Sequence, residues 1–192
     1  MSEFDFKFEE DTIEKTRALI LKLSKEHMEA YSEQEKRALG AGKAIKNAVK
    51  DGANTKENLR IIYDWKQESV AKRFWQVFEQ FDKNTEEDIS DALKLAVSAQ
   101  TDRSAVAVLL GLGGVQVPVA SAILAMIYPE KYTIIDRLAL RALNKDKYNM
   151  SVDLYLRYLN FCRAFAKRHV VTLRQLDHAL WTLGAKKVRS KK

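Results

Sequence analysis

Turn-forming residues are scarce in this sequence, which contains seven glycines and two prolines among 192 residues. Sandwiches and barrels of short β-strands need a turn roughly every ten residues, and glycine and proline mark most of those turns. Apolar residues recur instead at spacings of three and four along most of the chain, as on the buried face of an α-helix. We therefore expect an all-α fold in which many helices form a single domain.

The apolar stripes and the residues that cap helices predict roughly nine or ten helices and no strand. Early helices are expected from Thr12 to about Met28 and from Lys43 to Val49, with an interruption at Gly40 and Gly42. The later stripes place the following residues toward the core: Leu59, Ile62 and Trp65 after a cap at Asn54-Thr55; Val70, Phe74, Val77, Phe78 and Phe81; and Ile89, Leu93 and Ala96 after a cap at Thr85.

The C-terminal part of the sequence predicts three more helices and a charged tail. One helix is expected to begin near Asp136, and two follow at about 152–168 and 173–183. Residues 186–192 have no apolar face and predict a basic, flexible tail. Within the single helical domain, residues 1–185, we distinguish an N-terminal helical part, residues 1–60, from residues 61–185.

Composition limits the classes of protein to which this chain can belong. The single cysteine, Cys162, excludes an intramolecular disulfide and a four-cysteine metal site. Three histidines, His27, His169 and His178, are too far apart in the sequence to form a zinc motif. The N-terminus is acidic, unlike a signal peptide, and no apolar run is long enough to cross a bilayer. We expect a cytoplasmic monomer with no metal, no other cofactor and no membrane partner.

Positive charge is concentrated at the C-terminal end of the chain. Residues 1–136 contain 19 lysines and arginines against 23 acidic residues, whereas residues 137–192 contain 14 against 3. The first part carries a net charge of −4 and the second a net charge of +11. A basic region of this density attracts polyanions, of which DNA and RNA are the commonest in a cell. A purely solubilising role is the alternative.

A glycine-rich turn, Gly111-Leu112-Gly113-Gly114-Val115, joins two apolar helical stretches. Glycine permits positive φ and leaves the backbone uncovered, so that successive amides can converge on a phosphate. The second helix has Pro118 in its first turn, and the amides and dipole of a helix N-terminus favour an anion. A helix-hairpin-helix of this kind binds the phosphate backbone of DNA and makes no sequence-specific contact with the bases. An ordinary compact turn between two helices has the same glycines.

Residues 112–122 and 132–141 together resemble the core of the helix-hairpin-helix (HhH-GPD) DNA glycosylase superfamily. Gly114 and Val115 match the start of the family's Gly-Val-Gly pattern, and Ala120 matches its closing alanine. Asp136 lies at the position of the essential aspartate, and Arg141 at that of a following arginine. The rest of the chain resembles the family only in its helical character.

This resemblance implies a DNA glycosylase in which Asp136 is the catalytic carboxylate. It also implies that the hairpin and two arginines bind the DNA backbone: Gly111, Gly113, Gly114, Val115, Gln116, Val117, Arg137 and Arg141.

Two residues depart from the family's pattern. Gln116 stands where a second hairpin glycine is usual, and Pro118 occupies the position at which bifunctional members carry their Schiff-base lysine. The four-cysteine cluster of some members is also missing. We therefore expect the cluster-free, monofunctional branch, which removes the base with water and does not cleave the strand.

An aspartate suits this reaction chemically. As the base leaves, positive charge develops on the deoxyribose; a nearby carboxylate stabilises that charge and can orient or deprotonate the attacking water. Asp136 before Arg-Leu-Ala-Leu is also a good helix N-cap, a role worth about 1 kcal/mol. The two roles are compatible.

A glycosylase flips its target nucleotide and stacks the base against aromatic or apolar side chains. Candidate pocket residues are Tyr63, Trp65, Lys66, Pro118 and Tyr132. Aromatic residues at helical spacing are, however, more often part of the core. Other basic residues are candidates for binding backbone phosphates: Lys145, Lys147, Arg163, Lys167, Arg168 and those of the tail, residues 186–192.

Three functions are compatible with these patterns. The first is excision of a base from DNA, either in repair of damaged bases or in removal of hypermodified bases from phage DNA as a defence. The second is a non-catalytic helix-hairpin-helix DNA-binding protein, which Gln116 and Pro118 favour and Asp136 opposes. The third is a helical protein-interaction bundle, which predicts no salt-sensitive binding of DNA.

Overall fold

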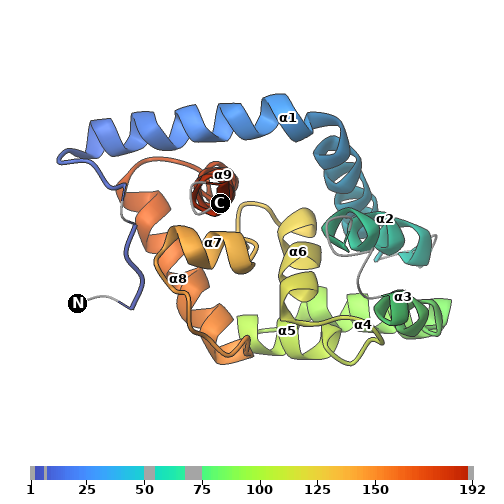
Figure 1. Cartoon of the computed structure of the whole chain (residues 1–192). Helices are drawn as coiled ribbons and strands as arrows, with labels where there is room; N and C mark the ends of the chain where they lie inside the picture. The colour runs from blue at the N-terminus through green and yellow to red at the C-terminus, as the bar shows by residue number, and fades with distance from the viewer. Residues whose placement is uncertain (1–2, 7, 50–54, 68–74, 190–192) are drawn as a thin grey trace. The chain divides into compact units, whose positions relative to one another are not determined.

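The computed structural model describes residues 3–6, 8–49, 55–67 and 75–189, and it confirms the all-α class (Figure 1). Within these ranges the chain forms helices and no strand. In chain order the helices are α1 (Ile13–Ala48), α2 (Thr55–Gln67), α3 (Trp75–Asp82), α4 (Glu86–Ser98), α5 (Asp102–Leu109), α6 (Val117–Ile127), α7 (Arg137–Ala142), α8 (Val152–Arg168) and α9 (Leu173–Arg189).

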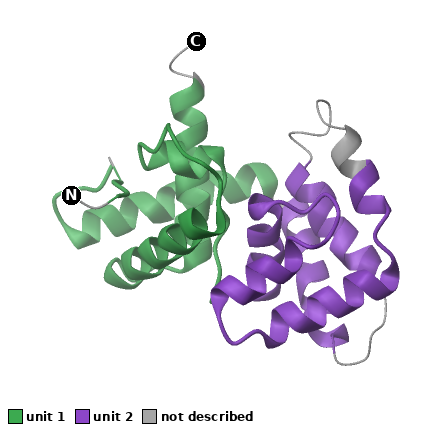
Figure 2. Cartoon of the chain, turned by 90° about the horizontal axis from the view of Figure 1, so that it is seen from below, with its two compact units in different colours: residues 1–32, 129–192 green, residues 33–128 purple. Residues whose placement is uncertain are grey.

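The chain divides into two compact units, which Figure 2 colours separately. Unit 1 comprises residues 1–32 and 129–192, and unit 2 comprises residues 33–128. This grouping differs from the expected division at residue 60, because α2 packs on α4 and α6 and so belongs with the residues that follow it. Unit 1 contains 20 lysines and arginines against 13 acidic residues, whereas unit 2 contains 13 of each. The net positive charge of the chain therefore belongs to unit 1.

The first helix is longer than the sequence predicts. α1 continues through Gly40 and Gly42, where the sequence predicts an interruption between two helices. A glycine inside a helix costs only about 1 kcal/mol relative to alanine, and packing can outweigh that cost. At Gly42 a Cβ would lie 2.2 Å from the carbonyl oxygen of Met126 in α6. This glycine therefore permits close approach of α1 and α6 and does not end a helix.

The predicted cap of α4 is confirmed. Thr85 Oγ1 accepts a hydrogen bond from the amide of Asp88, and the Asp88 carboxylate accepts one from the amide of Thr85. This reciprocal pair is a capping box, which satisfies two amides at the helix start. The predicted core residues of α4 are buried: Ile89, Leu93 and Ala96.

The predicted core residues of α2 and α3 are confirmed in part. Leu59, Ile62 and Phe81 are fully buried, whereas Trp65 is half-buried. The remaining predictions for this region lie outside the described residues or concern side chains that the structure does not describe: Asn54, Val70, Phe74, Val77 and Phe78.

α6 is the most deeply buried helix of unit 2. Ten of its eleven residues are buried, and it packs against α2 and α5. Pro118 lies in its first turn, as predicted, where a missing amide hydrogen removes no helical hydrogen bond. The segment that joins α5 to α6 is therefore attached to a helix whose position is set by packing on α2 and α5.

In unit 1, α9 packs against α7 and contacts α8. α7 and α8 begin where the sequence predicts, and α8 also ends at the predicted Arg168. Gly184 of α9 again marks a close approach, because a Cβ there would lie 2.1 Å from the carbonyl oxygen of Leu138.

The last turns of α9 extend into the predicted flexible tail, of which residues 190–192 lie outside the described residues. Residues 186–189 are helical. The ammonium group of Lys187 donates hydrogen bonds to the carbonyls of Arg141 and Ala142 at the C-terminal end of α7. Because the last carbonyls of a helix have no helical partner, a lysine at this position stabilises both helices.

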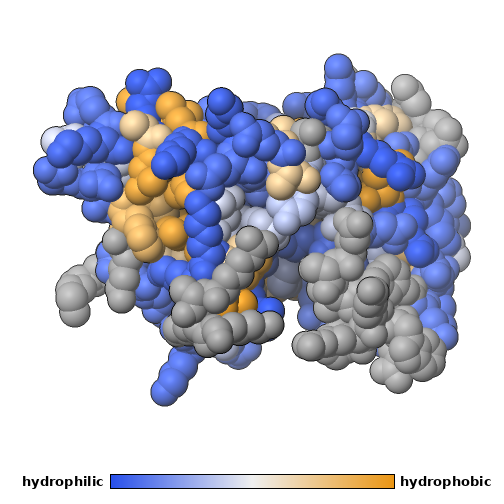
Figure 3. Space-filling view, turned by 45° about the horizontal axis from the view of Figure 1, so that its top comes forward, coloured by the Kyte–Doolittle hydropathy of each residue, from blue (hydrophilic) through white to orange (hydrophobic). Residues whose placement is uncertain are grey.

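Among the side chains that the structure describes, most of the large exposed apolar ones belong to unit 1. The large ones there are Phe8, Ile13, Leu21, Tyr31 and Val170. Figure 3 shows a face on which apolar side chains gather between hydrophilic ones. None of the helices in the described ranges combines the length and the hydropathy that crossing a membrane requires.

Candidate nucleic-acid interface and carboxylate

Residues 110–116, here called the glycine connection, join α5 to α6 through tight turns. The amides of Gly111 and Leu112 donate to the carbonyls of Val108 and Leu109, and the amide of Val115 donates to the carbonyl of Leu112. Gly114 has a φ of 76°, a conformation that disfavours any residue with a side chain. Two helices joined by a compact glycine turn are therefore present where the sequence predicts them.

Asn84, between α3 and α4, fixes the glycine connection. Its side-chain oxygen accepts a hydrogen bond from the amide of Gly113 at 2.8 Å, and its side-chain nitrogen donates to the carbonyl of the same residue at 3.0 Å. The side-chain nitrogen also donates to the carbonyl of Phe81 at 2.8 Å. Asn84 is not recognisable from the sequence, because its partner is distant in the chain and no local pattern links the two residues.

Gly113 is required for close packing. A Cβ at this position would lie 2.4 Å from the carbonyl oxygen of Gln80. Gly114 is held from another direction, since the Tyr63 hydroxyl donates to its carbonyl at 3.4 Å. The two glycines thus serve different purposes, one steric and one conformational.

Several backbone amides at the N-terminus of α6 have no hydrogen-bond acceptor in the part of the protein that the structure describes. Gln116 is the N-cap, and its side chain makes no capping hydrogen bond. Within the described residues, four amides around this helix start donate to no protein acceptor: Gly114, Gln116, Val117 and Val119. Amides of this kind, together with the positive end of the helix dipole, are the usual ligands of a phosphate at a helix N-terminus.

The Gly111 end of the connection has a different electrostatic character. Gly111 and Leu112 line a cavity of about 570 Å³ together with Glu87, Asp88 and Asp91 of α4. Carboxylates repel a phosphate group, so this end is a poor place for the DNA backbone. The amides that suit a phosphate lie at Gly114 and beyond.

Asp136 lies at the end of a buried segment. The four preceding residues, 132–135, are each at most 3% exposed, whereas Asp136 is half-buried. Its Oδ1 accepts a hydrogen bond from the amide of Ala139 at 2.9 Å, so it is the N-cap of α7. The N-cap role is thereby confirmed, and the catalytic role stays a prediction.

Two tyrosines of α8 hold the segment before Asp136. The Tyr155 hydroxyl donates to the carbonyl of Thr133 at 3.1 Å, and the Tyr158 hydroxyl donates to the carbonyl of Ile134 at 3.0 Å. Burial, with a smaller effect of nearby acidic groups that include Asp136, holds the pKa of Tyr158 well above its usual value. The hydroxyl therefore stays protonated and remains a donor.

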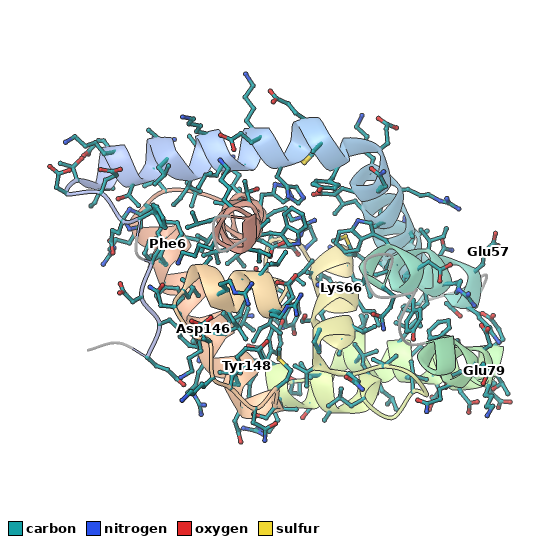
Figure 4. The ribbon with its side chains drawn as sticks, viewed as in Figure 1. Phe6, Glu57, Lys66, Glu79, Asp146 and Tyr148 are labelled. Carbon is teal, nitrogen blue, oxygen red and sulfur yellow. The ribbon has the colours of Figure 1, made fainter. Side chains whose placement is uncertain are left out.

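The two predicted backbone-binding arginines differ in their surroundings. Arg137 is exposed at the first position of α7. Arg141 is half-buried, and its Nε lies 3.8 Å from the carboxylate of Asp146. Figure 4 shows Asp146 and Tyr148 in the segment that follows α7. Arg137 is the more accessible of the two cations.

Several of the other predicted phosphate ligands contact the chain's own groups. Lys145 pairs with Glu3, Arg168 pairs with Glu9, and Arg163 donates to the carbonyl of Lys131. Lys147 and Lys167 are exposed. The acidic N-terminal residues therefore neutralise part of the basic region of unit 1.

The residues predicted to form the base pocket differ in their burial, and for Trp65, Lys66 and Pro118 the pocket stays a prediction. Tyr63 is fully buried, with its ring stacked on Phe81 at 4.1 Å between centroids, and Tyr132 is 3% exposed. Both rings are therefore core side chains and do not line an open pocket, as is usual for aromatic residues at helical spacing. The others are half-buried in unit 2: Trp65, Lys66 (labelled in Figure 4) and Pro118.

The fold brings together two histidines that are distant in the sequence. The rings of His27 and His178 stack in unit 1 with centroids 4.4 Å apart, and Ser24 Oγ lies 3.0 Å from His178 Nδ1.

Cys162 is buried, and burial raises the pKa of its thiol. Because a cysteine attacks as its thiolate, a buried thiol with a raised pKa is a core side chain and not a nucleophile.

The chain matches no protein-family model, no curated protein and no solved structure.

Proposed function

We propose that this protein is a monofunctional DNA glycosylase with Asp136 as its catalytic carboxylate. The observation that carries the proposal is the way in which neighbouring residues position the Asp136 carboxylate. A half-buried carboxylate follows four buried residues and is oriented by the Ala139 amide. The backbone just before Asp136 is held by two hydrogen bonds, which the hydroxyls of Tyr155 and Tyr158 donate to carbonyls of residues 133 and 134. A carboxylate held in this way needs little reorganisation when charge develops beside it.

The proposed reaction follows from the chemistry of the N-glycosidic bond. As that bond lengthens, the deoxyribose gains positive charge at C1′, which the Asp136 carboxylate stabilises. The base departs with the bonding electron pair and takes up a proton, while water adds to C1′ and loses a proton. A hydroxyl at C1′, that is an abasic site, and the free base are the products. The Pro118 position supplies no lysine for an imine, so the strand is not cleaved.

Binding to the DNA backbone is assigned to two features. The amides that begin at Gly114 provide a site for one phosphate at the N-terminus of α6. The net charge of +7 on unit 1, with Arg137 exposed beside Asp136, provides salt-dependent attraction. The substrate class is a damaged or modified base in DNA, either in repair or in defence against phage DNA.

The decisive experiment is detection of abasic sites with an aldehyde-reactive probe. Oligonucleotides with alkylated, oxidised or deaminated bases and phage DNA with hypermodified bases are incubated with the wild type and with Asp136→Asn. Asparagine is also a good N-cap, so the variant is expected to stay folded. Asp153→Asn, an exposed aspartate in the first turn of α8, is the matched control. Abasic sites with wild type and control but not with Asp136→Asn are the expected result.

The second candidate is a non-catalytic DNA-binding protein. The burial of Tyr63 and Tyr132 favours it, because neither ring is available to stack a flipped base. This candidate predicts unchanged DNA affinity in Asp136→Asn and no abasic sites with either protein. Loss of affinity between low and physiological salt separates both candidates from a protein-interaction bundle.

A further inference from the structure

The carboxylate of Glu3 is held between two cations of unit 1. Lys145 Nζ lies 3.0 Å from one oxygen, and Arg157 Nε lies 2.7 Å from the other. The hydrogen bond from Lys145, reinforced by Arg157, lowers the pKa of Glu3 below its usual value. A backbone phosphate also offers two charged oxygens to a lysine and an arginine.

The rest of the N-terminal segment is anchored separately. Phe4 and Phe6 are 3% and 2% exposed and pack on α8, where their rings contact Tyr158 and Phe165. Figure 4 shows Phe6 beside this helix. Glu3 precedes the first of these anchors, so its carboxylate can leave the two cations while Phe4 stays in place.

The two cations are accessible from solvent. The side chain of Arg157 is 56% exposed, and those of Lys145 and Glu3 are 27% and 33% exposed. Ion pairs at this level of exposure are weak and are screened by salt. A polyanion of high charge density can therefore displace the carboxylate.

We propose that Lys145 and Arg157 form a binding site for a DNA backbone phosphate, which the Glu3 carboxylate occupies when no DNA is bound. This inference rests on the proposed DNA-binding function and adds a means of regulating it. Glu3 weakens DNA binding by competing for the site. A change that removes its charge strengthens DNA binding.

Fluorescence anisotropy with a labelled duplex oligonucleotide tests the proposal on the full chain. Glu3→Gln keeps the size of the side chain and removes its charge. It is expected to bind about 3- to 10-fold more tightly at low salt, with the slope of log Kd against log salt steeper by about 1 to 2. Combining Glu3→Gln with Lys145→Ala and Arg157→Ala removes the gain.

Glu10→Gln is the matched control. Glu10 is exposed in the same N-terminal segment, and within the described residues its carboxylate pairs with no cation. The control changes the net charge equally and is expected to gain less than twofold. Thermal unfolding of each variant verifies that the fold is intact.

The possible outcomes separate this proposal from the one on which it rests. If the wild type binds DNA and Glu3→Gln gains no more affinity than Glu10→Gln, the phosphate site is refuted and the DNA-binding function stands. A gain in Glu3→Gln that survives the loss of Lys145 and Arg157 also refutes the site. If neither the wild type nor Glu3→Gln binds DNA at low salt, both proposals fail.

Discussion

The side chain of Asn84 accepts a hydrogen bond from the backbone amide of Gly113 and donates one to the carbonyl of the same residue. The corner between α3 and α4 therefore sets the conformation of the segment that leads into α6. The amides proposed to bind a phosphate lie immediately beyond this pair, at Gly114 and Gln116.

Replacing Asn84 with alanine is expected to destabilise the protein by about 1 to 3 kcal/mol, because both polar groups of Gly113 lose their partner in a part-buried position. Urea unfolding measures this change, and DNA affinity is expected to fall with it as the amides lose their arrangement. Asn47→Ala, at an exposed position of α1 in the same unit, is the control and is expected to change stability by less than about 0.5 kcal/mol. Equal unfolding midpoints for the two variants contradict this role of Asn84.

Two glycines of α1 provide a matched pair of substitutions. Gly42→Ala is expected to destabilise the protein by about 1 to 3 kcal/mol, because the new methyl group meets the backbone of Met126 and overpacks the contact with α6. Gly40→Ala meets nothing within 4 Å. It is therefore expected to stabilise the protein by about 1 kcal/mol through helix propensity alone. Thermal unfolding distinguishes the two, and effects of the same sign on both contradict the packing argument.

Local patterns were sufficient to predict much of the helical structure. The Thr85 cap, Pro118 in the first turn of its helix and the limits of α8 depend on residues within one or two turns of each other. Gly40 and Gly42 were misleading because the reason for a glycine in α1 lies in α6. The site shows the same division. Asp136 is recognisable as a helix N-cap from the residues that follow it, and as a candidate catalytic residue only through the family resemblance, whereas Asn84 is defined by a partner elsewhere in the chain.

The stability contribution of Glu86 is expected to depend on pH. Its carboxylate accepts hydrogen bonds from Thr55 Oγ1 and from the amide of Lys56, and so caps α2 from α4. Burial opposes ionisation, but these hydrogen bonds outweigh it and lower the pKa of Glu86 below its usual value of 4.5. Because the folded-state pKa is the lower one, this stabilisation is complete above pH 4.5 and is lost as pH falls through the folded-state pKa.

Glu86→Gln is therefore expected to be less stable than the wild type near neutral pH, by about 0.3 to 1 kcal/mol because solvent screens this exposed carboxylate. The difference in stability shrinks as the pH falls below the folded-state pKa of Glu86. Urea unfolding at several pH values measures this difference. Glu87→Gln, at the next and exposed position of α4, is the control and is expected to show no such trend. A Glu86→Gln difference that stays constant down to the acid range contradicts the assignment.

The contact between α9 and the end of α7 is expected to depend on the charge of Lys187. Its ammonium group donates to the carbonyls of Arg141 and Ala142 and to the side-chain oxygen of Asn144 at 2.9 Å. Lys187→Met keeps the aliphatic stem and removes the donor, and it is expected to destabilise the protein by about 1 to 2 kcal/mol. Hydrogen exchange is expected to accelerate in α7 and in the last turns of α9, because each helix end supports the other.

Lys147→Met, at an exposed position, removes the same charge without this contact and is expected to leave exchange in both helices unchanged. Equal protection in the two variants contradicts the capping role of Lys187.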